Sequence, residues 1–347
     1  MNILIITDAW APQVNGVVRT YDNVISEIEK YGHKVTVYHP KWLCFANGSP
    51  TNYWKMFRLP FYKGMEFIWN PEIYRNYILG RAYFGDKIHI ATEGPLGLYA
   101  KRLLDKEGIQ YTTSYHTRIP EYLSTWTKLP AKLFYPYFRW FHKKSKCVMT
   151  PTQGMIDKLK EKGFKNMKVW TRGVNQLIFN PKFRKVLHRP YIVCVSRVTK
   201  EKNLEEFCKL PHPHKVLVGD GPYLKELKQK YPHVEYKGKL QGASLAKVVA
   251  SADAFVFPSK TDTFGIVLLE AIACGTPVLA YAEPGPLEVI EEGVNGCLVH
   301  FDKKYGLHGR LEDKLQQTIN LSRDSVHFSA KKWTWEASAL DFLDNIK

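Results

Sequence analysis

Short apolar runs alternate with amphipathic segments along the whole chain. Residues 2–7 form an apolar run, and residues 17–32 carry apolar side chains at helical spacing and end at Gly32. Residues 33–39 form the next apolar run, so the chain opens with the βαβ unit of a parallel sheet. We expect further strands of this kind in two groups. They are residues 87–92, 110–115 and 147–150 in the first group, and residues 191–196, 215–219, 254–258, 277–281 and 296–299 in the second.

A basic, proline-flanked stretch without periodicity, residues 180–190, separates the two groups of strands. We therefore predict an α/β fold of two facing Rossmann-like domains, residues 1–183 and residues 188–330. Residues 331–347 are predicted to form an amphipathic C-terminal helix. In doubly wound sheets ligands bind at the carboxyl ends of the strands, so the loops after the strands are the candidate functional segments.

The most informative of these loops lies in residues 259–280, SKTDTFGIVLLEAIACGTPVLA, which run from a strand end into a helix. Asp262 precedes the helix, and Glu270 lies inside it among apolar residues, where a carboxylate needs a partner. Gly265 lies near the helix start, where backbone N–H groups and the helix dipole attract an anion. The segment favours binding of a phosphate and of sugar hydroxyls, although Asp262 alone could equally be a helix cap.

Two cations, Arg197 and Lys202, follow the first strand of the second domain. Beside a pyrophosphate they would offset the charge that builds on a leaving group as a glycosidic bond breaks. The alternative for such a pair in isolation is a solvated basic loop. Gly219 and Gly221, in the sequence GDGP, follow the next strand and permit close approach of the backbone, but any turn between a strand and a helix can use glycine.

The segment with Asp262 and Glu270 resembles the signature of the family-4 retaining glycosyltransferases of the GT-B fold. In that signature an acid and a Glu are separated by seven residues that include F-G, and the motif A-x-G-x-P-V follows. The resemblance extends over nearly the whole chain. It implies that Glu270 binds the ribose hydroxyls of a nucleotide and that Asp262 contacts the donor sugar. The family often has Glu where this chain has Asp262. The resemblance also implies that the C-terminal helix crosses back to the first domain.

Further site positions take their expected roles from the same resemblance. Gly16, at the start of the first helix, would face the diphosphate, and His116, at a strand end, would contact the donor sugar. The turn at Gly219 and residues 237–240, with Lys239 and Leu240, would lie near the nucleotide base. The alternatives are a plain turn at Gly16 and a structural role for His116.

Two other acidic residues are weaker candidates. Glu93 ends a strand and could contact the acceptor. Glu283, with the turn at Gly285, could meet sugar hydroxyls or the phosphate, or could simply belong to a turn and helix cap.

The reaction implied is attack by an acceptor hydroxyl on the anomeric carbon of a UDP- or GDP-linked hexose, with retention of configuration. No Asp-x-Asp triplet occurs in the sequence, so we expect no metal and no cofactor other than the nucleotide-sugar donor. Arg197, Lys202 and helix N-termini would replace the metal. A catalytically silent nucleotide-sugar sensor would not need Arg197 and Lys202, and a dehydrogenase is disfavoured because no G-x-G-x-x-G follows the first strand.

The formal net charge is +17, and residues 1–180 hold 26 Lys and Arg against 13 Asp and Glu. This excess suits an anionic partner such as membrane headgroups. Residues 52–84 and 119–146 mix aromatic side chains with cations, as interfacial anchors do, although the latter could be a buried helix with a basic outer face. Nucleic acid is not expected, because there is no recognised binding motif.

Localisation is predicted from the cysteines, the N-terminus and the hydropathy. The six cysteines form no C-x-x-C pair, which is typical of free thiols in a reducing cytosol. The sequence shows no signal peptide and no apolar stretch that approaches the ~20 residues of a membrane span. We expect a cytoplasmic protein bound peripherally to the inner face of the membrane.

The resemblance is strongest to the branch that glycosylates diacylglycerol-type lipids or adds mannose to envelope glycans. A lipid or lipid-linked glycan is therefore the expected acceptor, with a soluble acceptor as the alternative.

Overall fold

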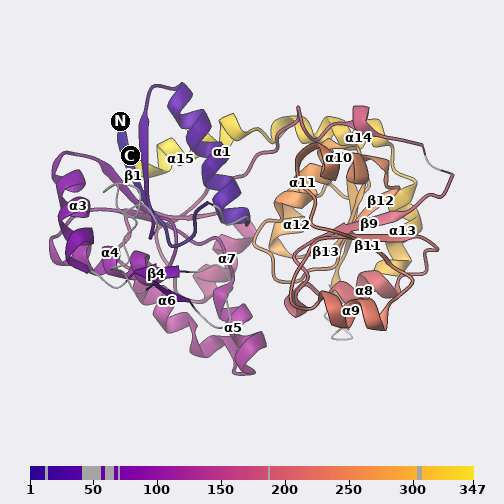
Figure 1. Cartoon of the computed structure of the whole chain (residues 1–347), viewed down its shortest axis with the longest axis horizontal. Helices are drawn as coiled ribbons and strands as arrows, with labels where there is room; N and C mark the ends of the chain where they lie inside the picture. Colours follow the sequence, from indigo (N-terminus) through magenta and orange to yellow (C-terminus); the bar gives the residue numbers. More distant parts are fainter. Residues whose placement is uncertain (12–14, 41–55, 59–65, 69–70, 187, 303–306) are drawn as a thin grey trace. The chain divides into compact units, whose positions relative to one another are not determined.

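The computed structural model of the 347-residue chain describes residues 1–11, 15–40, 56–58, 66–68, 71–186, 188–302 and 307–347. The chain forms two compact units (Figure 1). The first unit comprises Met1–Leu123, Leu129–Thr171 and Trp335–Lys347, and the second comprises Ser124–Lys128 and Arg172–Thr334.

The first unit is built on a six-stranded parallel sheet with the strand order β2-β1-β5-β6-β7-β8. Its strands are β1 (Asn2–Ile6), β2 (Lys34–Tyr38), β5 (Lys87–Ile90), β6 (Thr112–Ser114), β7 (Val148–Thr150) and β8 (Met167–Val169). A short antiparallel pair is formed by β3 (Met56–Arg58) and β4 (Glu66–Ile68). The helices of this part of the chain are α1 (Gly16–Lys30), α3 (Pro71–Tyr83), α4 (Pro95–Lys106), α5 (Ile119–Thr127), η1 (Ala131–Leu133), α6 (Tyr135–His142), α7 (Gln153–Glu161) and α15 (Trp335–Ile346).

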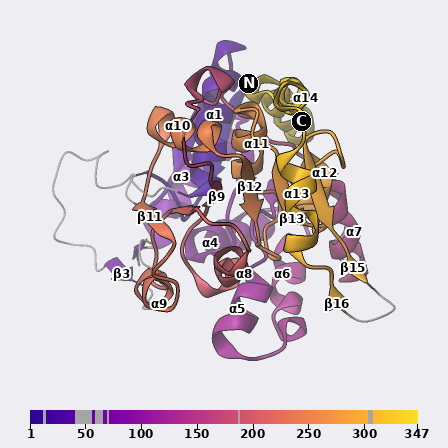
Figure 2. The same ribbon diagram turned by 90° about the vertical axis from the view of Figure 1, so that its right-hand side faces the viewer.

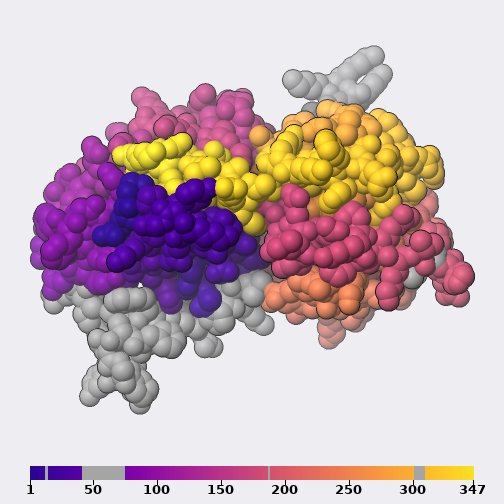
Figure 3. All heavy atoms as spheres, turned by 90° about the horizontal axis from the view of Figure 1, so that it is seen from above, coloured from indigo at the N-terminus to yellow at the C-terminus, as the bar shows by residue number. Residues whose placement is uncertain are grey.

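The two faces of the first sheet carry different side chains because successive residues of a strand point to opposite faces. Leu4 and Ile88 pack with α3 and α4 in one apolar cluster. His89, the next residue of β5, contacts Tyr21 of α1 and Phe342 of α15 instead. The C-terminal helix α15 therefore packs with α1 on the same unit, and in Figure 3 the C-terminal residues (yellow) lie beside the N-terminal ones (indigo).

The second unit contains another six-stranded parallel sheet, with the order β11-β10-β9-β12-β13-β14. Its strands are β9 (Ile192–Val195), β10 (Lys215–Val218), β11 (Glu235–Gly238), β12 (Ala254–Phe257), β13 (Val278–Tyr281) and β14 (Gly296–Val299), and β15 (Phe301–Asp302) pairs with β16 (Leu307–His308). Its helices are η2 (Pro181–Phe183), η3 (Lys200–Lys202), α8 (Leu204–Lys209), α9 (Leu224–Lys230), α10 (Gly242–Ser251), α11 (Ile266–Ala273), α12 (Pro284–Val289), α13 (Leu311–Ile319), α14 (Arg323–Ser329) and η4 (Ala330–Lys332).

Helices cover both faces of this second sheet (Figures 1 and 2). Val193 and Phe255 pack with residues of α10 and α11 in one apolar cluster, whereas Cys194 and Val256 pack with residues of α8, α9 and α13 in another. Burial on both sides explains why these strands are continuous apolar runs in the sequence. The predicted α/β architecture of two Rossmann-like folds is confirmed.

Two strands of the large sheets were not predicted, β8 and β11. Both are edge strands, and their residues are exposed or half-buried rather than fully buried. Their sequences, MKV and EYKG, lack the apolar run by which the other strands were recognised, because these two strands bury less of their surface.

Candidate active site

Two loops of the second unit meet at the carboxyl ends of the neighbouring strands β9 and β12. Three consecutive residues of the first loop each hydrogen-bond to the second loop. The bonds run from Thr261 Oγ1 to the Glu201 carbonyl oxygen (3.4 Å), from Lys202 Nζ to Asp262 Oδ1 (2.7 Å) and from Asn203 Nδ2 to the Pro258 carbonyl oxygen (3.2 Å). Asn203 has a left-handed backbone with a φ of 54°, which asparagine tolerates better than most residues. The sequence predicted two of these residues, Lys202 and Asp262, and the structure places their charges in direct contact.

The ion pair between Lys202 and Asp262 is largely shielded from solvent. The side chains are 9% and 21% exposed. Burial raises the pKa of the Asp262 carboxyl, but the charge of Lys202 and hydrogen bonds from Lys202 and Ser259 outweigh it, so the pKa lies below its usual value. Asp262 is therefore ionised at neutral pH, and the ammonium group of Lys202 is held at the strand ends.

Arg197 belongs to the same cluster through Glu201, a residue that the sequence analysis missed. The guanidinium of Arg197 lies 3.5 Å from Glu201 Oε1, and Thr199 Oγ1 donates to the same oxygen at 2.7 Å. The Glu201 side chain is 2% exposed, whereas that of Arg197 is 40% exposed. A buried carboxylate thus anchors a guanidinium that is partly exposed to solvent. The signal in the sequence was an acid four residues after Arg197 and next to Lys202.

Glu270 lies on the helix that follows the Asp262 loop, and Gly265 directly precedes that helix. Glu270 is buried in α11. Gly265 is the residue that precedes α11, with a left-handed backbone at a φ of 86° that glycine adopts without strain. The cap position of α11 is thus Gly265, and the Asp262 side chain is bound to Lys202 rather than to the helix start. This arrangement argues against the alternative in which Asp262 is only a helix cap.

The two glycines of the GDGP turn are required by the packing of the turn itself. A Cβ atom on Gly219 would fall on the carbonyl oxygen of Ser196, and one on Gly221 would fall on that of Val198. Gly219 also has a φ of 147°. These glycines therefore let the loop after β10 lie against the loop that carries Arg197.

Lys239 and Leu240, the predicted contacts of the nucleotide base, directly follow β11. Lys239 is exposed, and Leu240 is half-buried against the core of the unit.

Glu283 and Gly285 mark the start of α12. Glu283 occupies the cap position without a side-chain hydrogen bond to the helix, and a Cβ atom on Gly285 would fall on the carbonyl oxygen of Phe264. The glycine therefore serves the packing of α12 against the loop that follows Asp262.

Gly16 is the first residue of α1 in the first unit. Asn15 caps this helix, since its Oδ1 accepts from the backbone N–H groups of Val17 and Val18 at 3.0 Å. A Cβ atom on Gly16 would meet no atom of the described residues within 4 Å, so their packing does not require a glycine there. Residues 12–14, which precede this turn, lie outside the described residues.

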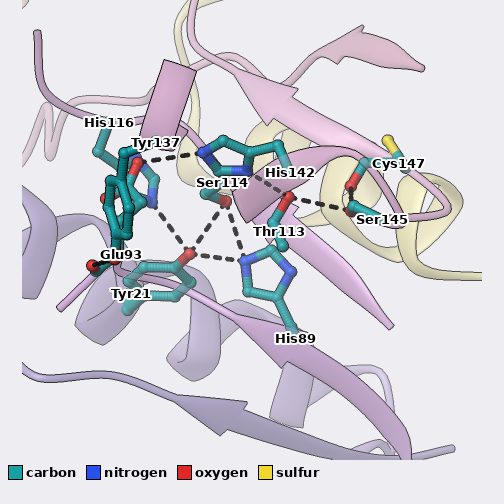
Figure 4. A network of polar contacts seen from close by, with 10 residues as sticks. All are labelled: Tyr21, His89, Glu93, Thr113, Ser114, His116, Tyr137, His142, Ser145 and Cys147. Atoms are coloured by element: carbon teal, nitrogen blue, oxygen red, sulfur yellow. Dashed lines mark hydrogen bonds and ion pairs between the residues drawn. The ribbon is translucent and has the colours of Figure 1, made fainter. Parts of the chain in front are cut away.

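His116 lies two residues after β6 and is half-buried. Its Nε2 lies 3.0 Å from the hydroxyl oxygen of Tyr21, which in turn contacts Nε2 of His89 at 2.7 Å and Oγ of Ser114 at 3.1 Å (Figure 4). Tyr21 was not predicted as a site residue, because in the sequence it is one more member of the apolar face of α1.

Glu93 ends a second polar chain in the same unit (Figure 4). Ser145 Oγ donates to the Cys147 carbonyl at 2.7 Å, and Thr113 Oγ1 therefore donates to Ser145 at 2.9 Å. Nδ1 of His142, 2.8 Å from Thr113 Oγ1, must then be a donor, and its Nε2 lies 3.3 Å from Glu93 Oε1. Both side chains are shielded from solvent, at 2% exposure for His142 and 5% for Glu93.

The aromatic and basic residues 119–146 divide between core and surface. Tyr135, Phe138 and Phe141 of α6 are buried, as the alternative of a helix with a basic outer face predicts. Trp140 is 41% exposed, and the ammonium of Lys101 lies 4.1 Å from its ring centroid. Much of the other stretch, residues 52–84, lies outside the described residues.

Five cysteines lie in the described part of the chain, and all five are buried free thiols. Cys44 lies outside it. Within the ranges that the structure describes, no helix combines the length and the apolar character that crossing a membrane requires.

Two family models match almost the whole chain between them. The model described as Glycosyltransferase Family 4 matches residues 14–176, and the model described as Glycosyl transferases group 1 matches residues 175–332. The first range contains five of the six strands of the first sheet, and the second range contains all six strands of the second sheet.

Curated relatives with stated activities are similar over much of the chain. A GDP-mannose-dependent alpha-mannosyltransferase of Corynebacterium glutamicum is 27% identical, over 99% of this chain and 88% of the relative. An alpha-monoglucosyldiacylglycerol synthase of Streptococcus pneumoniae is 26% identical, over 99% of this chain and 83% of the relative. The sulfoquinovosyl transferase SQD2 of Arabidopsis thaliana is 28% identical over 73% of this chain, and the match spans only 54% of that relative.

Solved structures share the fold at lower sequence identity. Sucrose-phosphate synthase from Thermosynechococcus elongatus superposes with a TM-score of 0.70 at 17% identity, over 99% of this chain and 98% of that one. HepE of Anabaena in complex with UDP superposes with a TM-score of 0.68 at 16% identity, over 99% of each chain. With two parallel sheets, a cationic cluster at the strand ends of the second unit and family models that match both halves, the chain belongs to the family-4 glycosyltransferases of the GT-B fold.

Proposed function

We propose that this chain is a retaining hexosyltransferase that moves a hexose from a UDP- or GDP-linked donor to a lipid or a lipid-linked glycan. The observation that carries the proposal is the cationic cluster of the second unit, in which Asp262 holds Lys202 and Glu201 holds Arg197. A diphosphate leaving group needs positive charge where its negative charge develops, and these cations are fixed before a donor binds. Electrostatic stabilisation of this kind costs no reorganisation at the moment of reaction.

In the proposed mechanism the cations act on the leaving diphosphate. Arg197, with 40% of its side chain exposed, can form the two-pronged contact with phosphate oxygens that a guanidinium favours. Lys202 supplies a point charge beside it, and its partner Asp262 contacts the donor sugar. Glu270 binds the ribose hydroxyls, and a phosphate oxygen takes the proton of the incoming acceptor hydroxyl.

The proposed transfer needs no metal ion, because Arg197, Lys202 and helix N-termini provide the positive charge that a divalent cation would otherwise supply. Turnover that persists in excess EDTA supports this assignment. Loss of turnover on chelation, with recovery on addition of Mg²⁺ or Mn²⁺, would overturn it.

A lipid acceptor is supported by the relatives and by the surface of the first unit. The similar proteins include a monoglucosyldiacylglycerol synthase and mannosyltransferases. At the end of α6 the exposed Lys143 and Lys144 lie close in sequence to Trp140, which is partly exposed. Lysine and tryptophan together suit the interface of an anionic membrane, so we propose peripheral binding at the inner face of the cytoplasmic membrane.

One panel of assays tests the activity. Radiolabelled UDP-glucose, UDP-galactose and GDP-mannose are each incubated with the full chain and either membrane lipid extract or soluble sugars. The proposal predicts label in the lipid fraction from one donor, with retained anomeric configuration. Label only in soluble products would overturn the lipid acceptor, and donor binding without any transfer would indicate a nucleotide-sugar sensor.

Vesicle sedimentation tests the proposed membrane contact. The full chain is mixed with vesicles of phosphatidylcholine alone or with added phosphatidylglycerol, and binding is expected only to the anionic vesicles. The double variant Lys143→Glu, Lys144→Glu should bind less, whereas Lys228→Glu, in α9 of the second unit, should bind as the unaltered chain does. Binding that ignores lipid charge would overturn the anionic-surface proposal.

A further inference from the structure

The carboxyl group of Glu93 uses one of its two oxygens within the first unit (Figure 4). Oε1 lies 3.3 Å from Nε2 of His142, and the Glu93 side chain is 5% exposed. Within the described residues, Oε2 of Glu93 has no hydrogen-bond partner. Because both oxygens of a carboxyl group as buried as this one normally have partners, Oε2 is an acceptor for which the described residues supply no donor.

His142 holds the carboxyl group of Glu93 in place. The imidazole is 2% exposed, and its Nδ1 donates to Oγ1 of Thr113 at 2.8 Å. The rings of Phe141 and Phe164 lie 5.0 and 5.9 Å from it. A proton on Nε2 of His142 or on Oε1 of Glu93 leaves the lone pairs of Oε2 in place, so Oε2 is an acceptor in either case.

A protein carboxyl group occupies the N-terminus of α4, the helix that begins two residues after Glu93. Oδ1 of Asp8 accepts from the backbone N–H of Leu96 at 2.7 Å, and Oδ2 accepts from that of Gly97 at 3.3 Å. Thr92 Oγ1 donates to the same Oδ2 at 2.8 Å, and Asp8 is 2% exposed. Asp8 thus takes the place at a helix N-terminus where a phosphate group would otherwise bind.

The rest of the first turn of α4 offers no backbone N–H to an anion. Pro95 has none, and the N–H of Leu98 donates to the carbonyl oxygen of Gly94 at 2.7 Å. A Cβ atom on Gly94 would lie 2.5 Å from Cγ of Asp8, so the glycine allows Asp8 to reach the helix. The start of α4 therefore has no donor for a phosphate group, whereas Oε2 of Glu93 is an acceptor for a hydroxyl group.

Two partly exposed aromatic rings of α6 lie next to Glu93. The hydroxyl of Tyr137 donates to the carbonyl oxygen of Glu93 at 3.0 Å. The ring centroids of Tyr137 and Trp140 are 6.0 Å apart, and the residues are 38% and 41% exposed. An aromatic surface beside an acceptor oxygen suits a ligand that has both hydroxyl groups and apolar surface.

We propose that Glu93 is an acceptor-binding residue of the transferase and selects acceptors whose reacting end carries neutral hydroxyl groups over those that carry a phosphate there. Oε2 of Glu93 accepts a hydrogen bond from such a hydroxyl, and the apolar part of the acceptor packs against Tyr137 and Trp140. The inference rests on the proposed transfer to a lipid or lipid-linked acceptor.

Acceptor preference tests the selectivity without any variant. The full chain and the active radiolabelled donor are incubated with phosphatidylcholine vesicles that contain dioleoylglycerol, glucosyl-dioleoylglycerol, phosphatidylglycerol or phosphatidylinositol. All vesicles contain the same proportion of phosphatidic acid, which has no alcohol hydroxyl, so that their surfaces remain anionic. The proposal predicts faster labelling of a neutral lipid than of either phosphatidyl lipid. Labelling of a phosphatidyl lipid at an equal or higher rate overturns it.

Replacement of Glu93 tests the contact itself. Glu93→Ala should lower kcat/KM for the neutral acceptor about tenfold or more, as expected for loss of a hydrogen bond to a carboxyl group, while the KM of the donor is unchanged. Glu93→Gln keeps an oxygen that can accept from a hydroxyl and should lose less. The control is Glu107→Ala in the same unit, which removes a carboxylate that is 23% exposed and paired with Arg75, and should leave acceptor kinetics unchanged. The acceptor panel remains decisive if Glu93→Ala does not fold.

Hydrolysis of the donor by water separates the inference from the proposed function, because it needs no lipid acceptor. Glu93→Ala should hydrolyse the donor at the rate of the unaltered chain while its transfer to the lipid is impaired. Unchanged acceptor kinetics in Glu93→Ala would overturn the inference alone. Donor hydrolysis by the unaltered chain without transfer to any lipid would overturn the proposed lipid acceptor, and the inference with it.

Discussion

The ammonium group of Lys202 lies 2.7 Å from the carboxylate of Asp262, although 60 residues separate them in the chain. The contact joins the loop after β9 to the loop after β12, two strands that are neighbours in the sheet. Two segments recognised separately in the sequence thus form one charged cluster. The position of Lys202 is fixed by the protein rather than by a ligand, which is the condition for preorganised stabilisation of a leaving group.

Replacing Lys202 with Met should lower both stability and turnover. Removal of one partner leaves a largely buried carboxylate without its counter-charge, at a cost of about 2 kcal/mol or more in the free energy of unfolding. Turnover should fall about 100-fold or more, as it does when a group that stabilises transition-state charge is removed. Urea denaturation and steady-state kinetics measure the two effects.

The matched control is Lys209→Met in the same unit. Lys209 pairs with Glu206 at 3.3 Å, but both side chains are largely exposed. Exposed pairs contribute little, so its stability should change by no more than about 0.5 kcal/mol. Equal losses of stability in the two variants would show that burial does not increase the contribution of the Lys202–Asp262 ion pair to stability.

Glu201→Gln should slow turnover while the protein stays folded. Glutamine keeps an oxygen that can accept from Thr199, but it lacks the negative charge that attracts the guanidinium of Arg197. We expect kcat to fall about tenfold, the size expected for one charge-assisted hydrogen bond. Combining it with Arg197→Ala should add little to the effect of Arg197→Ala alone, since both act through one group. Fully additive losses in kcat would show that Glu201 does not act through Arg197.

Gly219→Ala should destabilise the second unit strongly, because a methyl group there would overlap the backbone of Ser196. We expect a loss of about 3 kcal/mol or more in the free energy of unfolding, as for other substitutions that force backbone to move. Gly293 is the control: its φ is 75°, yet a Cβ atom would meet none of the residues that the structure describes within 4 Å. Gly293→Ala should cost only about 1 kcal/mol, the conformational strain alone. Similar melting temperatures for the two variants would rule out the steric explanation.

His89 should make stability depend on pH in the acidic range. Burial lowers its pKa from 6.5 to about 3, so between these values the unfolded chain binds a proton that the folded chain does not. The free energy of unfolding should therefore fall as the pH is lowered from 6.5 towards 3, by up to about 1.4 kcal/mol per pH unit from this group, and should be unaffected by it above 6.5. Denaturation at several pH values should show a shallower decline for His89→Gln than for the unaltered chain. The exposed His214, replaced by Gln, should leave the decline as it is, and an equal slope in all three proteins would contradict the prediction.

The central strands could be predicted because the sheets are covered on both faces, which makes strands such as β9 and β12 continuous apolar runs. The edge strands β8 and β11 lack that signal, because their residues are exposed or half-buried. In the site, Lys202 and Asp262 were found from motifs that are local in the sequence. Glu201 and Tyr21 were not, because their importance depends on neighbours that only the folded chain supplies. Tyr21 is typical: its partners His89, Ser114 and His116 lie on other elements, 68 to 95 residues away.

The most direct test of the cationic cluster is single-turnover transfer from the active radiolabelled donor, in excess EDTA, with the unaltered chain, Arg197→Ala and Lys202→Ala. We expect the unaltered chain to transfer the sugar without a metal ion and each variant to cleave the donor about 100-fold more slowly. Rates in Arg197→Ala and Lys202→Ala equal to that of the unaltered chain would contradict it.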